Sequence, residues 1–303
     1  MRASTTLPLA ALAAGAAGLG WSLVEARAFT LRRASIPVLP PGSPSLRVLH
    51  LSDLHLVPRQ RRKIEWVQRL AEWQPDLVVS TGDNLAHQEA VPHVLASHAG
   101  LLSLPGVFVM GSNDYWAPKL KNPARYLLRY GGRRRIHGSA LPTADLIRGF
   151  SEAGWLDLNN RRGQLKFGDL VLEFVGVDDP HIRRDRYDRV AAPADPSASL
   201  TIGVTHAPYR RVLDAMAADG AGLLLAGHTH GGQLCVPGYG ALTTNCDLDR
   251  GRAKGVSHWP GDGSAPGDAW MNVSAGLGTN PYTPVRFACR PEASLLTLTA
   301  RPA

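Results

Sequence analysis

Two histidines separated by one residue follow a short apolar run in the second half of the chain. The run is Leu223–Ala226, and Gly227-His228-Thr229-His230-Gly231-Gly232 comes directly after it. Side chains two positions apart in extended backbone point the same way, so His228 and His230 can face one centre. Neutral imidazole is a common ligand of transition metals, and this stretch therefore indicates a metal site. The alternative is a glycine-rich turn that carries two solvated histidines.

The ends of four other apolar runs carry further side chains that can bind metal ions. These side chains are Asp53 and His55 after residues 46–51, Asp83 after 76–80, Asn113 after 106–110, and His206 after 200–205. Each alone is explained equally well as a turn or helix cap. Together they favour a site, because ligands of open α/β sheets gather beyond the carboxyl ends of strands. Oxygen and nitrogen donors without thiolates suit Zn, Mn or Fe, and seven candidates are enough for two ions that share a bridging ligand.

The elements that must position these residues alternate along the first half of the chain. Residues 46–51, 76–80 and 106–110 read as buried strands, and helical spacing appears between them at 64–73 and 91–102. Strands that alternate with helices predict a parallel sheet. The turn signal Gly168-Asp169 predicts a hairpin, and the short strands and turns that follow indicate a second sheet. The expected fold class is α/β.

Composition limits the class of protein. A chain of 303 residues with 44% hydrophobic and 19% charged residues is globular rather than disordered. Three irregularly spaced cysteines are too few for a disulfide framework or a thiolate zinc site. The formal net charge of +8 favours anionic partners such as phosphate esters, nucleic acid or anionic lipid head groups, without choosing among them.

The N-terminus predicts an association with a membrane. Residues 7–24 carry no charge, and Ala26-Arg27-Ala28 offers a small-x-small cleavage site, so we expect residues 1–28 to be a signal peptide or a membrane anchor. Arginines after the run favour a cytoplasmic C-terminal side, but the side of the membrane stays open. Four prolines within residues 29–45 predict a stiff linker, and residues 46–303 would then form the globular domain.

A basic region at residues 125–135 ends in three consecutive arginines, Arg133-Arg134-Arg135. Such a run usually forms a solvated face. The functional alternative is contact with a substrate phosphate or a lipid head group, which the bidentate geometry of arginine serves well.

As a set, the polar strand ends resemble the calcineurin-like metallophosphoesterase superfamily, whose sequence blocks read D-x-H, G-D, G-N-H-[DE], H and G-H-x-H. The resemblance extends over residues 46–298, and four of the five blocks fit at the proper spacing. Residues 227–233 and 276–279, with Arg286 and Cys289-Arg290-Pro291-Glu292, look like a membrane-associated bacterial branch. The resemblance implies a four-layer sandwich in which two mixed β-sheets are flanked by helices.

The resemblance also implies a role for each ligand in a centre of two divalent ions. Asp53, His55 and His230 would hold the first ion, His206 and His228 would hold the second, and Asp83 would bridge the two. Two ions roughly 3.5–4 Å apart would clamp a phosphate ester while a bridging hydroxide attacks phosphorus in line.

The third block departs from the family pattern. It reads Gly111-Ser112-Asn113-Asp114, so Asn113 stands where the family has a histidine. We expect Asn113 to supply the oxygen ligand of the second ion and to act in catalysis beside Asp83, with Ser112 as the alternative ligand. Asparagine cannot donate a proton at neutral pH, although its amide can hydrogen-bond a developing charge. The enzyme would then be slow, prefer good leaving groups, or borrow another histidine; His181 is a candidate, unless it is a surface residue of an Asp-Asp-Pro turn.

The function predicted from these residues is metal-dependent hydrolysis of a phosphate ester or pyrophosphate. The membrane segment and the branch resemblance favour a lipid or nucleotide-linked lipid substrate, such as UDP-2,3-diacylglucosamine. One alternative is a metal-binding relative without turnover, which the missing histidine supports. Another is a nuclease or cyclic-nucleotide phosphodiesterase, which the net charge of +8 supports; we do not expect nucleic acid as a partner, because the basic residues have no aromatic platform among them.

Overall fold

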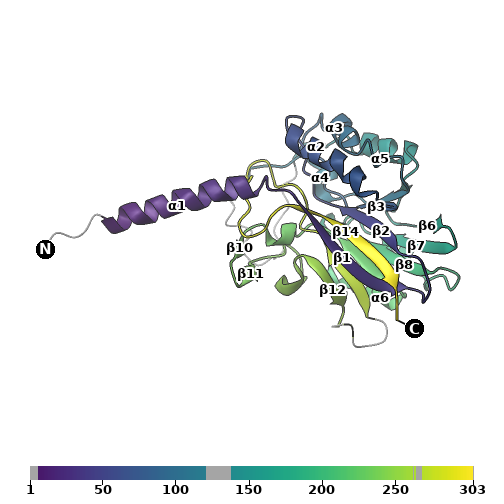
Figure 1. Ribbon diagram of the computed structural model, residues 1–303. Coiled ribbons are helices and arrows are strands. Elements are labelled where there is room, and N and C mark those ends of the chain that lie inside the picture. The colour runs from purple at the N-terminus through teal and green to yellow at the C-terminus, as the bar shows by residue number, and fades with distance from the viewer. Residues whose placement is uncertain (1–5, 121–137, 262, 264–267, 303) are drawn as a thin grey trace.

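The computed structural model describes residues 6–120, 138–261, 263 and 268–302. The basic region expected at residues 125–135 lies outside these described residues. Two six-stranded sheets form the centre of the molecule (Figure 1). The strands of the first sheet are, in spatial order, β1 (Thr30–Leu39), β14 (Glu292–Ala300), β2 (Leu46–Leu51), β3 (Leu77–Ser80), β4 (Gly106–Phe108) and β5 (Leu156–Asp157). Those of the second are β12 (Gly255–Trp259), β13 (Ala269–Val273), β9 (Leu223–Ala226), β8 (Leu200–Val204), β7 (Leu170–Gly176) and β6 (Arg161–Phe167).

Both sheets are mixed. In the first sheet β14 is antiparallel to β2, whereas β2, β3, β4 and β5 run parallel. In the second sheet β7, β8, β9 and β13 run parallel between antiparallel outer strands. A small hairpin, β10 (Cys235–Val236) and β11 (Gly240–Ala241), lies apart from both sheets. The parallel stretches are those that the strand–helix alternation predicts.

The described helices lie outside the two sheets. They are α1 (Thr6–Glu25), α2 (Arg61–Gln68), α3 (Val91–Ser97), α4 (Ser112–Tyr115), α5 (Thr143–Glu152) and α6 (Arg210–Ala218), with short 3-10 turns η1 (Arg69–Trp73), η3 (Pro180–Ile182), η4 (Tyr187–Arg189), η5 (His230–Gly232) and η6 (Arg250–Arg252). Helices α2, α3 and α5 lie on the first sheet, and α6 lies on the second (Figure 1). The order of layers is helix, sheet, sheet, helix, so the predicted four-layer α/β sandwich is confirmed.

Alternation of side chains along the strands produces these layers. In β2, Leu49 and Leu51 pack with the helices, whereas Val48 points to the other sheet and packs with residues such as Phe174 and Ile202. These side chains are fully buried, and burial of each leucine or phenylalanine contributes about 1.5–3 kcal/mol. The rigid sandwich that results holds the strand ends in fixed positions.

The N-terminal side of the sandwich differs from our expectation. Residues 29–45 were expected to form a linker, but Thr30–Leu39 form β1, which pairs in parallel with β14. Ile36 and Leu39 are fully buried between the sheets, so this strand belongs to the core. Pro37 is compatible with β1 because the strand lies at the edge of its sheet, where a missing backbone N–H costs little.

Helix α1 projects from the body of the molecule, and its C-terminal end is joined to the fold (Figure 1). The carboxylate of Glu25 is buried and accepts hydrogen bonds from the backbone N–H groups of Ala288 (3.1 Å) and Cys289 (2.6 Å). The carbonyl of Ser22 accepts from the backbone N–H of Arg286 at 3.0 Å. A helix capable of crossing a membrane, by length and apolar character, is not found in the described part of the chain.

Candidate metal centre

The turns that follow β2, β3, β8 and β9 bring the predicted ligands to one edge of the sandwich. Five of these residues have left-handed backbone conformations, which residues other than glycine seldom adopt: Asp53 (φ 50°), His55 (φ 42°), Asp83 (φ 55°), His228 (φ 69°) and His230 (φ 51°). Such conformations cost energy and cluster at functional sites, where the surrounding structure holds them in place. These backbone conformations turn side chains that follow separate strands toward a common centre.

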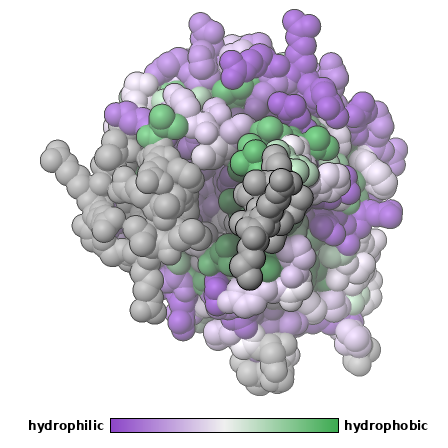
Figure 2. Space-filling model, turned by 90° about the vertical axis from the view of Figure 1, so that its left-hand side faces the viewer, coloured by the Kyte–Doolittle hydropathy of each residue, from purple (hydrophilic) through white to green (hydrophobic). Residues whose placement is uncertain are grey.

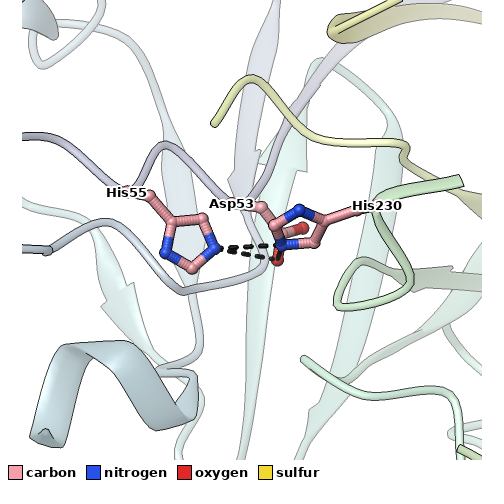
Figure 3. Close-up of side chains that lie close together, drawn as sticks. All are labelled: Asp53, His55 and His230. Carbon is pink, nitrogen blue, oxygen red and sulfur yellow. Dashed lines mark hydrogen bonds and ion pairs between the residues drawn. The ribbon is translucent and has the colours of Figure 1, made fainter. Parts of the chain in front are cut away.

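Asp53, His55 and His230 form the first group of ligand atoms (Figure 3). The two histidine Nε2 atoms are 3.0 Å apart, and the Oδ1 atom of Asp53 lies 3.4 Å from His230 Nε2 and 3.9 Å from His55 Nε2. The Nδ1 atoms of both histidines are buried and have no hydrogen-bond partner among the described residues. Converging nitrogen and carboxylate oxygen atoms at these distances fit a transition-metal ion.

Asp53, Asp83 and His206 form a second group next to the first. The Oδ2 atom of Asp83 lies 3.5 Å from Nε2 of both His55 and His206, so this carboxylate stands between the two groups. His206 Nδ1 is 2.7 Å from the carbonyl oxygen of Thr81, which fixes the ring with Nε2 toward the centre. A histidine ligand oriented by a backbone carbonyl on its other nitrogen is a common feature of metal sites.

His228 lies beside the second group but outside the two groups of converging ligand atoms. Its ring packs edge-on against His206, with centroids 5.2 Å apart, and its Nε2 atom is 3.2 Å from the carbonyl oxygen of Asn245. The backbone N–H of His228 donates to the carboxylate of Asp53. His228 therefore borders both groups, although its ring nitrogens do not converge with theirs.

Asn113 is hydrogen-bonded to Asp83, the carboxylate that lies between the two groups of ligand atoms. Its side-chain Nδ2 donates to Asp83 Oδ2 at 2.6 Å, and its backbone N–H donates to Asp83 Oδ1 at 2.7 Å. The hydroxyl of Ser112 is 3.5 Å from the same Nδ2 atom. Glycine is required just before this pair, because a Cβ atom at Gly111 would collide with Asp83 Oδ1. Both candidates for the second-ion ligand are thus at the centre.

Burial and neighbouring charges set the protonation of these groups. Burial lowers the pKa of His55 to about 3 and that of His228 to about 4, so both rings are neutral at pH 7. Burial alone would raise the pKa of Asp53, but the hydrogen bond and charge of His230 hold it below its ordinary value. Neutral imidazole and ionised carboxylate are the forms that bind metal ions. His55, His228 and Asp53 are therefore in the forms that fit divalent cations. At His206 burial lowers the pKa but the charge of Asp83 raises it well above its ordinary value, so this ring would lose a proton when a cation binds.

Two buried residues that support the site were not predicted. The carboxylate of Asp114 accepts four backbone hydrogen bonds, from the residues Asp83, Asn84, Leu85 and Gly111. The guanidinium of Arg286 donates to the carbonyl oxygens of Ala275, Gly276, Gly278 and His230. Asp114 lies in the third block and Arg286 lies near the C-terminal motif. The sequence does not show that they hold loops in place, because this role corresponds to no characteristic spacing of residues.

The residues after β7 also reach the centre. The ring of His181 lies 4.3 Å from the ring of His228, measured between centroids, and its Nδ1 is 3.1 Å from the hydroxyl of Tyr209. The carboxyl of Asp179 is fully buried, and within the described part of the chain its Oδ2 has no hydrogen-bond partner. Burial raises the pKa of Asp179 to about 7. The Asp-Asp-Pro turn thus places His181 beside a predicted ligand and not on a remote surface.

Comparisons with known proteins show what this chain is similar to. An uncharacterised metallophosphoesterase of Aquifex aeolicus is 28% identical over 270 residues, covering 86% of this chain and 87% of that protein. A transmembrane protein with a metallophosphoesterase domain from Danio rerio is 28% identical over 211 residues, covering 66% of this chain and 44% of that protein. The crystal structure of a Danio rerio dimetal phosphatase is 11% identical with a TM-score of 0.41, covering 78% of this chain and 88% of that one. The model of the calcineurin-like phosphoesterase family matches residues 46–232, and the chain belongs to this family.

Proposed function

We propose that this chain hydrolyses a phosphate ester or pyrophosphate with two divalent cations, Mn, Fe or Zn, held at the ends of β2, β3, β8 and β9. Membership of the family supports a metal-dependent phosphoester hydrolase. The observation that carries the two-ion proposal is the position of Asp83, whose Oδ2 atom is 3.5 Å from a ligand nitrogen in each group. A carboxylate can offer one oxygen to each of two ions.

Each ligand has an assigned place in the proposed centre. The first ion takes Asp53, His55, His230 and Asp83; the second takes Asp83, Asn113, His206 and His228. When bound, the cations would supply a nucleophile at neutral pH and neutralise charge on the phosphoryl group. The chain contributes orientation: the Thr81 carbonyl fixes the His206 ring, and Asp114 holds the backbone of the turn that carries Asp83.

In this proposal the third block lacks the residue that would protonate the leaving group. Asn113 can donate a hydrogen bond to a leaving oxygen but cannot protonate it. General acid catalysis contributes about 10²–10⁴-fold, so we expect substrates with good leaving groups to react far faster than alkyl esters. His181 lies beside the centre and could supply a proton, because its ring is 4.3 Å from that of His228.

For the substrate we propose a phosphorylated lipid or a nucleotide-linked lipid, such as UDP-2,3-diacylglucosamine. In support, residues 7–24 are uncharged, the formal net charge is +8, and one relative is named a transmembrane protein. We further propose that α1 attaches the enzyme to the membrane. The phosphoesterase domain proper would begin with β1, since Thr30–Leu39 are part of the first sheet.

Replacement of the bridging carboxylate tests the hydrolase. In Asp83→Asn we expect loss of at least one bound ion and a decrease of about 10³-fold or more in hydrolysis of an activated aryl phosphodiester with added Mn. Metal content of the purified protein and turnover are measured together. Asp188→Asn is the matched control, because Asp188 is exposed and lies in η4.

The same experiment separates the enzyme from a metal-binding relative without turnover. The departure at Asn113 is the feature that favours the relative. Wild-type protein that binds two ions and leaves the activated diester intact would establish the non-catalytic role. Unchanged metal content and turnover in Asp83→Asn would contradict both proposals.

A further inference from the structure

Exposed apolar side chains of the described residues gather at one end of the molecule. Twelve large hydrophobic residues are exposed, and ten of them belong to α1 or to two neighbouring segments. Those on α1 are Leu12, Leu19, Trp21, Leu23 and Val24. The other five, here called the apolar collar, are Leu234, Val236, Tyr239, Leu242 and Tyr282. Figure 2 shows hydrophobic atoms around the projecting helix on this face.

The collar is joined to the base of α1 by a continuous set of hydrogen bonds. The backbone N–H of Arg286 donates to the Ser22 carbonyl at 3.0 Å, and the backbone N–H of Cys235 donates to the Phe287 carbonyl at 2.9 Å. The side-chain amide of Gln233 donates to the Thr283 carbonyl at 3.2 Å, which links the loop containing Tyr282. Helix α1 and the collar therefore form one continuous surface.

The distribution of side chains around α1 indicates what covers this surface. At 100° per residue, Leu12 and Leu19 lie on nearly the same side of the helix, and Trp21 lies on the opposite side. Their exposed fractions are 75%, 59% and 57%. A protein groove buries one stripe of a helix, whereas lipid surrounds a helix that is apolar on all sides. The surface thus fits a bilayer better than a protein partner.

Charge at the rim of the collar agrees with a phospholipid surface. Arg27, Arg250 and Arg290 are exposed, and the Arg250 guanidinium lies 5.2 Å from the ring centroid of Tyr239. A cavity of about 850 Å³ between the β10–β11 hairpin and η6 is lined by Tyr239, Arg250 and Lys254, among others. Aromatic and basic side chains are enriched where proteins meet lipid head groups.

We propose that the apolar collar rests on an anionic phospholipid bilayer, with α1 beside it, so that the metal centre faces the membrane surface. Hydrogen bonds join the segments that carry the collar to the turn that carries His230: Cys235 Sγ, between two collar residues, is 3.2 Å from the Gly231 carbonyl, and the Arg286 guanidinium is 3.3 Å from the His230 carbonyl. One consequence of this contact, access of the metal centre to a phosphate ester carried by a lipid, rests on the proposed function. The contact itself requires no turnover.

Quenching of a fluorescent label tests the contact. The full chain is reconstituted in nanodiscs of phosphatidylethanolamine and phosphatidylglycerol, and an environment-sensitive label is attached to Tyr239→Cys in a Cys246→Ser background. Cys235 and Cys289 are buried, so labelling is selective. Trp73→Cys is the matched control, because Trp73 is an exposed aromatic residue at the end of η1, just before β3 and away from the strand ends that form the centre.

We expect a nitroxide on the lipid head group to quench the label at 239 about threefold or more compared with the label at 73, and iodide in the water to show the reverse order. Equal quenching at the two positions would overturn the proposal, as would failure of the chain to enter nanodiscs. A label at 239 that is shielded from iodide but not reached by the nitroxide would indicate a protein partner and would also overturn it.

Hydrolysis of a soluble aryl phosphodiester by the same labelled proteins separates this inference from the proposed function. Neither Tyr239 nor Trp73 belongs to the metal centre, so we expect both labelled variants to match wild type. Lipid quenching at position 239 in a protein without hydrolase activity would support the membrane contact and contradict the proposed hydrolase function. Hydrolase activity without lipid quenching would support the proposed function and contradict the membrane contact.

Discussion

Asn113 stands where the third block of the family has a histidine. Its side chain donates to the carboxylate of Asp83, the place from which the family's histidine would act on the leaving group. We predict that Asn113→His raises the turnover of alkyl phosphate esters by roughly 10-fold or more, because an imidazole can protonate the leaving oxygen. Turnover of activated aryl diesters should change little, since their leaving groups need no proton.

The ratio of the two rates is the informative measurement for Asn113→His. A kcat ratio of alkyl to aryl substrates that rises only in this variant, and not in Asn113→Gln, would identify the added acid. Equal decreases for both substrates would mean instead that Asn113 matters for the position of Asp83. In that case the hydrogen bond from Nδ2 to Asp83, at 2.6 Å, would be the important contact.

His98 lies far from the centre and reports on stability. Its ring packs against Phe150 and Trp155, and its Nδ1 is 2.8 Å from the Val94 carbonyl. Its buried Nε2 has no hydrogen-bond partner in the residues that the structure describes. Burial lowers the pKa of His98 to about 4. The unfolded chain therefore binds a proton between pH 6.5 and 4 that the folded chain excludes, and stability decreases as pH falls through this range.

We predict that His98→Met removes part of this pH dependence. Between pH 6.5 and 5 the wild type should lose about 2 kcal/mol of unfolding free energy more than the variant. Urea unfolding of chelator-treated protein at several pH values measures the difference. Parallel curves for the two proteins would show that His98 is protonated in the folded state as readily as in the unfolded chain.

At the scale of single residues, the types of the ligands could be predicted but their support could not. Asp53, His55, Asp83, His206 and His230 were expected from their places after apolar runs, and the structure brings them together. Their left-handed backbone was not expected, because nothing local to Asp or His requires it. Asp114 holds four backbone groups from two loops that are distant in sequence, a role that depends on the folded loops and not on a motif.

Among the elements, the end of α1 depends on one buried carboxylate. Glu25 accepts from the backbone of Ala288 and Cys289, and from the indole N–H of Trp21 at 2.9 Å. We predict that Glu25→Ala loosens the join by about 2 kcal/mol, because the buried N–H of Cys289 and the part-buried N–H of Ala288 lose their partner. Amide hydrogen exchange at Ala288 and Cys289 should then be roughly thirtyfold faster.

Glu65→Ala is the control for that prediction, since Glu65 is an exposed acid in α2. Exchange at Ala288 and Cys289 should be unchanged in this variant. An unchanged rate in Glu25→Ala as well would mean that the hydrogen bond from Arg286 to the Ser22 carbonyl is sufficient to hold the helix end.

Elements that pair with nearby sequence were predicted better than those that pair at long range. The strands before Asp53, Asp83 and His206 were recognised from apolar runs, and the turn at Gly168-Asp169 joins β6 to β7 as expected. Strand β1 was missed, because its partner β14 lies about 260 residues away, and because Pro37 and the three prolines after the strand read as a linker. Register between distant segments is a property of the assembled sheet and has no local signal.

At the scale of the whole molecule, a buried polar contact joins the two sheets. His50 in β2 has its Nδ1 atom 2.8 Å from the side-chain amide of Asn272 in β13, and its Nε2 atom 2.9 Å from the hydroxyl of Thr81. All three side chains are buried, and burial lowers the pKa of His50 to about 4, so the ring is neutral at pH 7. The contact fixes how the sheets sit on each other, and both sheets supply ligands.

A double-mutant cycle measures the contribution of this contact. In Asn272→Leu the Nδ1 atom of His50 loses its donor, and in His50→Leu the amide of Asn272 loses its acceptor. Each single variant should lose about 1–3 kcal/mol of unfolding free energy, as expected for a buried polar group left without a partner. The double variant places apolar side chains on both sheets, and we predict that it loses less than the sum of the singles by about 1–2 kcal/mol. Urea unfolding of the four metal-free proteins gives the coupling, and losses that simply add would mean that the sheets are aligned by apolar packing alone.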